Sequence, residues 1–546
     1  MILVARGAPA AEFVVSVDGR SGPGAPGRSL FECAEELGVH VPTSCVKQGK
    51  CRECLVEVEE GGELLSPPAP QEAHLEGRFR LACRTRIVAP GAVRCRTLRR
   101  GALRIETEAE GLEEATPLDP AVTRDGDRVL VDGRPVAARP GPIHGIALDL
   151  GTTTVALRLY DLETGALEAT QAFENPQRFG GSDVMARIRY DGEHKGRLLQ
   201  RTLLGYLSRA VTALPCDPLT IYEAVVVGNP TMRDLFFGLD VAPIGVIPYR
   251  STTEVALREG RAATTALSTT ASKLRLPLHP EARVYGLPVV GSHVGADAAA
   301  CLLALGLFDS DEVSAVLDIG TNTEAFVGNR KRLLAASCPA GPAFEGGGVA
   351  CGMAALDGAV ERVRLGDDGR AEMRVVGGGP PAGICGSGLV DLLSELRRTG
   401  RMNAQGRFQE EEGPLDLGGG LFLTEADVNE LAQAKGANVA GLRVLLETYG
   451  IGAHDLHRLY LAGGFSRHLD VEAARRIGLV PEVGGDRMRQ VGNAALHGAA
   501  IALCSVSRRR ALEEAVKRVE HVRLETHPRF FDFFVEGCQF APFGAE

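Results

Sequence analysis

The pattern of hydrophobic and polar positions in the first hundred residues predicts short strands around one helix. Residues 13–17 and 55–59 alternate in the way that is typical of strands with one buried face. Ser29 and Glu32 have the spacing of a capping box, in which each side chain bonds the backbone amide of the other residue. This pair predicts a helix over residues 30–37.

Further along the chain, apolar runs that end in glycine-rich turns predict an α/β unit. The sequence Asp-x-Gly-Thr occurs twice, at residues 149–152 and 318–321, and each copy lies between two apolar strands. A third apolar strand ends at Gly463 and Gly464, ahead of a predicted helix. The repetition indicates a duplicated domain.

These turns have the composition of phosphate-binding loops. Backbone amides and threonine hydroxyls can bond phosphate oxygens, and the aspartate can hold Mg²⁺ or order a water molecule. One such turn alone would be weak evidence, but two copies predict a nucleotide between two halves. A Gly-Gly turn lets the backbone approach a nucleoside closely, although a plain strand-to-helix turn is the alternative.

Four cysteines in the N-terminal segment have the spacing of an iron–sulfur site. Cys45, Cys51 and Cys54 lie in one tight loop, and Cys83 follows about thirty residues later. Four thiolates in this arrangement can hold two iron ions. A zinc ribbon is the alternative, but it requires two Cys-x-x-Cys pairs and only one is present.

Residues 101–142 differ from both flanking regions because they are acidic and rich in turn residues. Only residues 128–132 have the pattern of a strand. The segment is predicted to be a linker or a minimal middle domain, and a solvated spacer is slightly favoured over a folded dimerisation element.

Composition and charge exclude several classes of protein. A chain of 546 residues with 45% hydrophobic and 24% charged positions is expected to fold into several globular domains. A net charge of −10 argues against nucleic acid or an anionic membrane as the partner. We find no pattern of a signal peptide or a transmembrane helix, and thirteen cysteines without an export signal favour a reduced, cytoplasmic protein.

The motifs resemble known families. The cysteine loop resembles that of [2Fe–2S] ferredoxins of the β-grasp fold, with five rather than four residues between the first two cysteines. Residues 146–503 resemble the ASKHA superfamily of acetate and sugar kinases, Hsp70 and actin. A closer likeness, to reductive activators of corrinoid proteins, rests on five short motifs, at residues 227–232, 291–297, 339–346, 384–389 and 491–495.

The resemblance implies the architecture and the roles of individual residues. We expect an α/β multidomain protein with a β-grasp ferredoxin domain (1–100), a linker or small middle domain (101–142) and a duplicated ASKHA-type ATPase unit (143–546). The iron ligands would be Cys45, Cys51, Cys54 and Cys83. Asp149 and Asp318 would manage Mg²⁺ and the attacking water. The phosphates would contact Gly151, Thr152, Thr153, Gly320, Thr321 and Asn322. Adenosine would contact Gly463, Gly464 and Phe465.

Three more residues, Asn229, Asp297 and Glu345, lie in glycine-flanked turns that the resemblance places at the cleft. Capping or turn roles without a ligand are an equal alternative for them.

The resemblance also implies a function. It is the ATP-dependent reduction of cob(II)alamin in a corrinoid protein to cob(I)alamin, with a low-potential ferredoxin or flavodoxin as electron donor. The family's homodimer is a candidate assembly, although the connector looks shorter than the family's middle domain. A small-molecule kinase with an accessory cluster and a nucleotide-gated redox sensor remain as alternatives.

Overall fold

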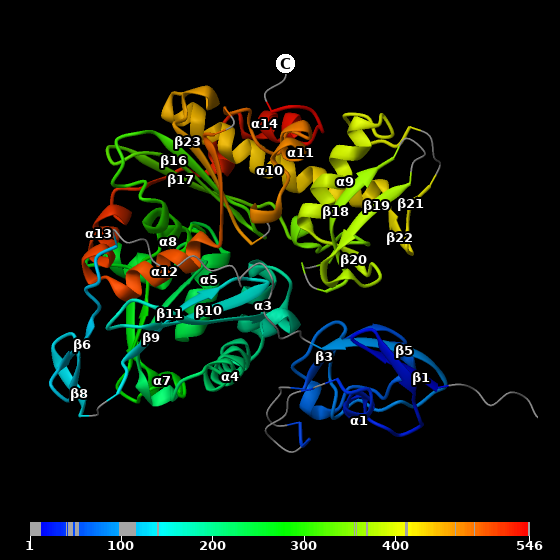
Figure 1. Cartoon of the computed structure of the whole chain (residues 1–546), viewed down its shortest axis with the longest axis horizontal. Helices are drawn as coiled ribbons and strands as arrows, with labels where there is room; N and C mark the ends of the chain where they lie inside the picture. The colour runs from blue at the N-terminus through cyan, green and yellow to red at the C-terminus, as the bar shows by residue number, and fades with distance from the viewer. Residues whose placement is uncertain are drawn as a thin grey trace, which may run out of the picture.

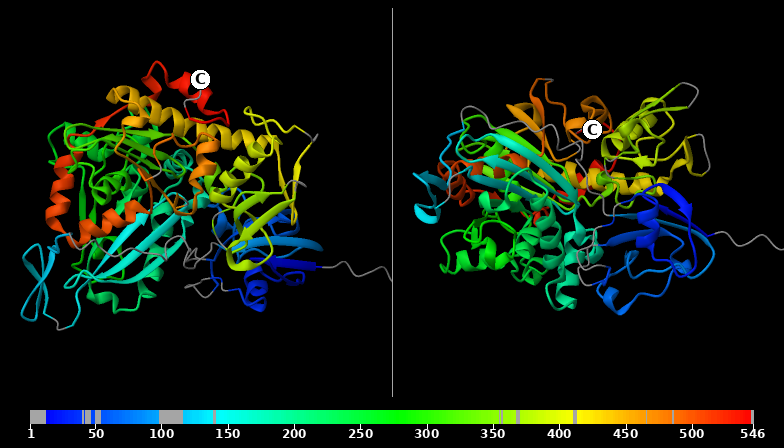
Figure 2. Two further views of the ribbon diagram at one scale, coloured as in Figure 1. Left: turned by 45° about the horizontal axis from the view of Figure 1, so that its top comes forward. Right: turned by 60° about the horizontal axis from the view of Figure 1, so that its bottom comes forward.

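The computed structural model describes residues 13–39, 41, 47–49, 54–97, 116–138, 141–353, 355, 357–366, 370–409, 413–464, 466–484 and 486–543. Figure 1 shows a smaller N-terminal part beside a large α/β unit. The large unit is built on two six-stranded sheets. The two further views in Figure 2 also show the N-terminal part next to the large unit.

The N-terminal part is a five-stranded sheet in the order β2-β1-β5-β3-β4, with one helix packed on it. The elements are β1 (Phe13–Val17), β2 (Arg20–Pro23), α1 (Leu30–Glu36), β3 (Leu55–Glu60), β4 (Phe79–Leu81) and β5 (Gly91–Thr97). The Ser29 hydroxyl accepts from the Glu32 amide and the Glu32 carboxylate accepts from the Ser29 amide, which confirms the capping box. The predicted strands and helix are present.

The described part of the connector forms a three-stranded antiparallel sheet, where a solvated spacer was slightly favoured. Its strands are β6 (Val122–Asp125), β7 (Arg128–Val131) and β8 (Arg134–Ala138). Val122, Val129 and Val131 are buried and join a core of the large unit. Only β7 has a run of large apolar residues, Val129 to Val131, whereas β6 and β8 hold one valine each, which is why the sequence pattern indicated one strand.

The two large sheets repeat one topology. The first has the order β11-β10-β9-β12-β14-β13 and the second β24-β23-β15-β16-β17-β25. In each sheet, an antiparallel meander, β9-β10-β11 or β15-β16-β17, pairs in parallel with a later strand, β12 or β23. The strands of the first sheet are β9 (His144–Leu150), β10 (Thr154–Asp161), β11 (Leu167–Glu174), β12 (Ile221–Gly228), β13 (Leu267–Thr270) and β14 (Arg283–Gly286). Those of the second are β15 (Ser314–Asp318), β16 (Thr323–Gly328), β17 (Leu333–Cys338), β23 (Arg458–Ala462), β24 (Met488–Gly492) and β25 (Glu520–His521).

Two apolar helices fill the centre of the large unit. These are α8 (Ala296–Leu305) and α12 (Ala494–Cys504), which pack against each other; α12 also packs on β9. Their alanine-rich faces allow a close approach, since a side chain at Gly498 would overlap the Ala300 carbonyl oxygen. Asp297 in the first turn of α8 and Ala495 in the first turn of α12 line the pocket described below.

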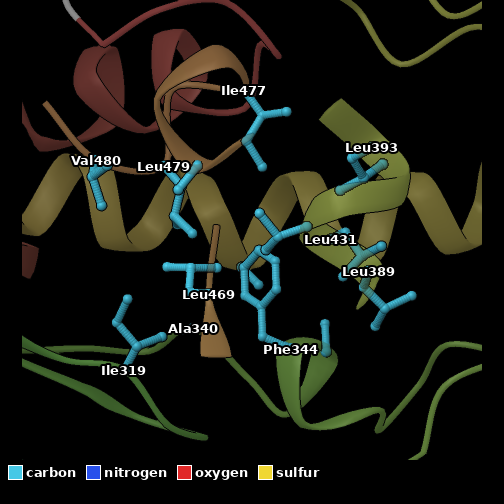
Figure 3. Close-up of a cluster of buried hydrophobic side chains, with 14 of the residues drawn as sticks. Ile319, Ala340, Phe344, Leu389, Leu393, Leu431, Leu469, Ile477, Leu479 and Val480 are labelled. Atoms are coloured by element: carbon cyan, nitrogen blue, oxygen red, sulfur yellow. The ribbon is translucent and has the colours of Figure 1, made fainter. Parts of the chain in front are cut away.

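The large unit has further helices outside this pair. They are α3 (Val184–Glu193), α4 (Leu198–Thr212), α5 (Pro230–Phe237), α6 (Thr252–Arg258), α7 (Ala271–Leu274), α9 (Gly386–Arg398), α10 (Glu425–Tyr449), α11 (Val471–Arg476), α13 (Val506–Val516) and α14 (Phe530–Gly537). Smaller sheets are formed by β18 (Ala359–Leu365), β19 (Ala371–Val375), β20 (Gly383–Ile384), β21 (Leu415–Gly418) and β22 (Leu421–Leu423). Helix α9 packs on β18, and Figure 3 shows part of the apolar core that joins α9, α10 and α11 to the second sheet.

The aromatic C-terminal segment is docked on the large unit. Helix α14 packs on α10, and Phe533 and Phe540 are buried. Among the described residues, no helix is long and apolar enough to cross a membrane.

Candidate functional site

The two Asp-x-Gly-Thr turns face each other across one pocket. The first connects β9 to β10 and the second connects β15 to β16. The predicted nucleotide-site residues that the structure describes all line this pocket: Asp149, Gly151, Thr152, Thr153, Asn229, Asp297, Asp318, Gly320, Thr321, Asn322, Glu345, Gly463 and Gly464. Phe465 lies outside the described residues.

The Gly-Gly turn after β23 lies directly against the second phosphate loop. Gly463 has φ +99°, and a Cβ there would lie 2.2 Å from the Ile319 carbonyl oxygen. Only glycine fits this conformation and this approach. The close contact fixes the turn at the edge of the pocket.

The carboxylate of Glu345 bridges the two loops. Thr153 Oγ1 donates to Glu345 Oε2 at 2.6 Å, and Thr321 Oγ1 donates to the same oxygen at 2.5 Å. Glu345 ends the short helix Ala343–Glu345, and Gly346 follows with φ 84°. A carboxylate therefore accepts both threonine hydroxyls in the space between the loops.

The two loop aspartates each have a specific partner. Asn493 Nδ2 donates to Asp149 Oδ2 at 2.8 Å, and the Cys301 thiol donates to Asp318 Oδ2 at 3.1 Å. Burial raises the pKa of Asp318, and the thiol donor acts in the opposite direction. Burial also raises the pKa of Asp297, to about 7.

The pocket is strongly acidic. Its lining includes the five carboxylates of Asp149, Asp297, Asp318, Glu324 and Glu345, and among the described residues that line it none is lysine or arginine. Carboxylates packed together in a low-dielectric site repel one another and repel an anionic ligand unless a cation is bound. Carboxylate oxygens are also the ligands that Mg²⁺ prefers.

Asn229 combines the capping and cleft roles that the sequence left open. Its Oδ1 accepts from the Met232 amide at the start of α5, at 2.9 Å, and its Nδ2 donates to Thr152 Oγ1 at 3.1 Å. The residue thus anchors the first phosphate loop to a helix N-terminus. Asp297 lies in the first turn of α8 and lines the pocket.

Sequence reasoning missed three polar contributors to the site. Cys301 is fully buried, and its thiol contacts Asp318. Asn493 belongs to a quoted motif that had no assigned role, and Glu324 follows the second loop without any signal of its own. The contacts of Cys301 and Asn493 join residues far apart in the chain, which a local pattern does not reveal.

The second site lies in the N-terminal part. Cys54 and Cys83 are buried, and their Sγ atoms lie 3.3 Å apart. Two thiols that converge at this distance fit a shared metal cluster. Cys45 and Cys51 lie outside the described residues. Cys95 is a buried packing residue, and burial raises the pKa of its thiol to about 12.

Three family models match the chain. The 2Fe-2S iron-sulfur cluster binding domain matches residues 16–88, the RACo middle region matches 144–310, and the C-terminal ASKHA domain of RACo matches 312–545. The chain belongs to the family of reductive activators of corrinoid proteins. Its domains are those of an ATP-hydrolysing iron–sulfur oxidoreductase, and the predicted fold class is confirmed. The middle-region match begins at residue 144, after the three-stranded connector sheet.

Individual relatives of this family align over most of the chain. The corrinoid activation enzyme RamQ of Eubacterium limosum is 29% identical, over 93% of this chain and 95% of the relative. The [Co(II) methylated amine-specific corrinoid protein] reductase of Methanosarcina barkeri is 26% identical, over 72% of this chain and 76% of the relative. The solved structure of a reductive activator for corrinoid,iron-sulfur protein superposes with a TM-score of 0.71 at 27% identity, covering 97% of this chain and 99% of that chain.

Proposed function

We propose that this protein reactivates a corrinoid protein by ATP-dependent reduction. One electron from a low-potential ferredoxin or flavodoxin would pass by way of a [2Fe–2S] cluster to cob(II)alamin, regenerating cob(I)alamin for methyl transfer. The observation that carries the proposal is the combination, in one chain of the corrinoid-activator family, of converging buried thiols with a pocket between two phosphate loops. A homodimer is a further part of the proposal, which sedimentation velocity would test.

The thiols of Cys45, Cys51, Cys54 and Cys83 would hold the cluster. When bound, it supplies one-electron transfer at about −400 mV if it resembles plant-type centres. Reducing an acceptor that lies lower by about 59 mV costs about 1.4 kcal/mol for one electron. A nucleotide whose binding and hydrolysis favour different conformations can offset such a cost.

The pocket would bind MgATP. Hydroxyls and amides of residues 151–153 and 320–322 would bond the phosphates, and the turn at Gly463, Gly464 and Phe465 would line the adenosine site. Five carboxylates and no described lysine or arginine line this pocket, so binding a polyphosphate requires a divalent cation to compensate the charge. Of the two loop aspartates, Asp149 is the proposed group that holds Mg²⁺, directly or through water, and Asp318 the group that orients the attacking water.

Hydrolysis would use Asp318 to accept a proton. Water would attack the γ-phosphorus, the bond to the β,γ-bridging oxygen would break, and the proton would go to the carboxylate. The raised pKa of Asp318 suits this role because a stronger base accepts a proton more readily. The hydroxyls of Thr153 and Thr321, which donate to Glu345 in this structure, would turn one or both of their bonds from the carboxylate to the arriving phosphate.

The test is anaerobic optical spectroscopy of the chemically reduced protein mixed with a cob(II)alamin-loaded corrinoid protein, with and without MgATP. We expect a cob(I)alamin band that requires MgATP and is lost in Cys54→Ser and in Asp318→Asn. Cys95→Ser is the matched control, because it removes a buried thiol of the same domain that is not a proposed ligand.

Two other outcomes would overturn the proposal. ATP turnover that rises with a small metabolite, and not with a corrinoid protein, would favour the kinase. The second outcome is that the protein binds nucleotide and hydrolyses none, with a small metabolite or with a corrinoid protein. In protein shown to contain iron and sulfide, that result would favour a nucleotide-gated redox sensor.

A further inference from the structure

One buried cation beneath the first phosphate loop has no role in the function proposed above. Arg187 on α3 is completely buried, and its guanidinium donates to three neutral acceptors: the carbonyl oxygens of Gly181 and Thr152, and the sulfur of Met232. It forms no ion pair within the described part of the chain. Burial lowers its pKa to about 9, so the side chain is still charged at neutral pH. The carboxylates of Asp183 and Glu345 attract the guanidinium without pairing with it. A buried charge that lacks a paired counter-charge is costly unless a ligand supplies one.

The contact with Thr152 links Arg187 to the proposed phosphate site. Its Nη2 donates to the Thr152 carbonyl oxygen at 2.6 Å. That carbonyl shares a peptide unit with the Thr153 amide, and a cation on the carbonyl oxygen strengthens the amide as a donor. Anionic phosphates at the loop would in turn stabilise the guanidinium.

The segment that carries Arg187 holds the whole loop. Asn175 Nδ2 donates to the Gly151 carbonyl oxygen at 2.8 Å, and the Asn175 amide donates to the Thr153 carbonyl oxygen at 2.7 Å. Together with the contact from Arg187, these bonds mean that three consecutive carbonyl groups of the loop accept hydrogen bonds from one short segment, residues 174–194. A shift of the loop therefore displaces this segment.

The same segment docks the iron–sulfur domain. Arg96 of β5 donates to Glu174 at 3.1 Å, and Arg178 lies 3.8 Å from Glu57 of β3. The Tyr190 hydroxyl donates to the His74 carbonyl oxygen. The side chains of Glu57, Arg96 and Glu174 are each less than one-fifth exposed, so the ion pairs are protected from solvent.

Ring contacts support this junction. The rings of Phe179 and His74 meet edge to face at 5.8 Å, and Phe179 contacts Tyr190 in the same way at 5.5 Å. Tyr190 lies three residues after Arg187 on α3, so both side chains lie on the same side of the helix. One side of α3 thus contacts the phosphate loop and the iron–sulfur domain.

We propose that Arg187 is a positioning residue that couples nucleotide at the first phosphate loop to docking of the iron–sulfur domain. Phosphate charge over the loop compensates the buried guanidinium, and α3 passes the change to His74 through Tyr190. The inference rests on the proposed function for the nucleotide pocket, and it adds how occupancy of that pocket reaches the redox domain.

Hydrogen exchange of the full-length, cluster-loaded protein tests the coupling. Saturating Mg-AMPPNP is expected to slow exchange at residues 72–81 by about fivefold or more, a coupling of ordinary allosteric size. Nucleotide affinity is measured on the same samples by calorimetry. Arg187→Met is expected to bind AMPPNP roughly tenfold more weakly, because one charge-assisted contact to the loop is lost, and to show no slowing at saturation. Arg187→Lys, which keeps the charge, is expected to regain part of both.

Tyr190→Phe separates coupling from stability of the pocket. It removes one hydroxyl at the domain junction, so AMPPNP affinity is expected to stay within about threefold of wild type while the slowing at residues 72–81 falls. Tyr160→Phe is the matched control, because Tyr160 lies in the central core between the two large sheets. It should respond to nucleotide as wild type does.

The outcomes distinguish the two proposals. If wild-type protein binds AMPPNP and forms cob(I)alamin with ATP, but exchange at residues 72–81 does not respond, the coupling is wrong and the proposed function stands. A full response in both Arg187→Met and Tyr190→Phe also overturns the coupling. If AMPPNP does not bind at all, the proposed nucleotide site fails and the coupling fails with it.

Discussion

At the scale of single residues, the site is organised by carboxylates whose partners differ. Glu345 accepts hydrogen bonds from two hydroxyls on opposite loops. Asp149 accepts one from a side-chain amide, and Asp318 accepts one from a thiol. A carboxylate that accepts hydroxyls at the phosphate position competes with the ligand, whereas a donor on a buried aspartate tunes its basicity. Substitution of these residues should therefore affect binding and turnover differently.

Glu345→Gln is expected to bind MgATP more tightly and to hydrolyse it more slowly. Loss of the charge removes the repulsion between the carboxylate and the phosphates. It also weakens the threonine hydrogen bonds to residue 345, and a gain of about 1 kcal/mol in nucleotide binding lowers the Kd roughly fivefold. Equilibrium binding and single-turnover hydrolysis measure the two effects. Glu430→Gln, on the exposed side of α10, is the control. Weaker binding by Glu345→Gln would show that the carboxylate does not compete with the nucleotide.

Cys301→Ala is expected to move the acidic limb of the pH–rate profile for ATP hydrolysis to higher pH. The thiol stabilises ionised Asp318, so its loss raises a pKa that burial has already raised. Hydrolysis requires the carboxylate and falls as pH drops through that pKa, so activity is lost at a higher pH than in wild type. Cys301→Ser, which keeps a donor, should restore most of the profile. A limb that does not move in Cys301→Ala would exclude Asp318 as the titrating base.

At the scale of elements, sequence reasoning succeeded where the signal is local. The capping box at Ser29, the loops at Asp149 and Asp318, and the Gly463 turn each depend on a few adjacent residues, and each was located correctly. Contacts between distant elements were not predictable. Thr153 and Glu345 are 192 residues apart, and their contact exists because the two halves of the duplicated unit close on one pocket.

The turn after β23 allows a sharp test of how elements pack at the pocket. Gly463→Ala places a Cβ 2.2 Å from the Ile319 carbonyl oxygen, so the turn must move away from the second loop. We expect MgATP affinity to fall at least about tenfold, because displaced backbone cannot keep the adenosine site. Gly420→Ala is the matched control: its φ is also positive, at +82°, but no atom lies within 4 Å of the added Cβ. Equal effects of the two substitutions on affinity would contradict a role for the close approach.

At the scale of the whole molecule, the C-terminal segment packs along α10, at the top of the large unit in Figure 1. Helix α14 packs on α10, and Lys435 of α10 donates to the Gln539 carbonyl oxygen at 2.7 Å. Burial lowers the pKa of Lys435 to about 7, and the ammonium also lies over the Phe540 ring. Lys435, an ionisable residue, thus lies at the contact between the C-terminal segment and α10.

The lowered pKa of Lys435 implies that the protein becomes more stable as pH rises from about 7 toward 10. In that window the unfolded state, with an ordinary lysine pKa of about 10.4, binds a proton that the folded state does not, so the free energy of unfolding increases with pH. Lys435→Met should raise the Tm at pH 7 and flatten its rise toward pH 10, because methionine fills the cavity without a charge to desolvate. Lys517→Met is the control, since Lys517 is exposed and pairs only with Glu514 among the described residues. Thermal unfolding across this range decides the point, and a Tm profile that is the same in wild type and Lys435→Met would mean that the buried amine does not titrate on unfolding.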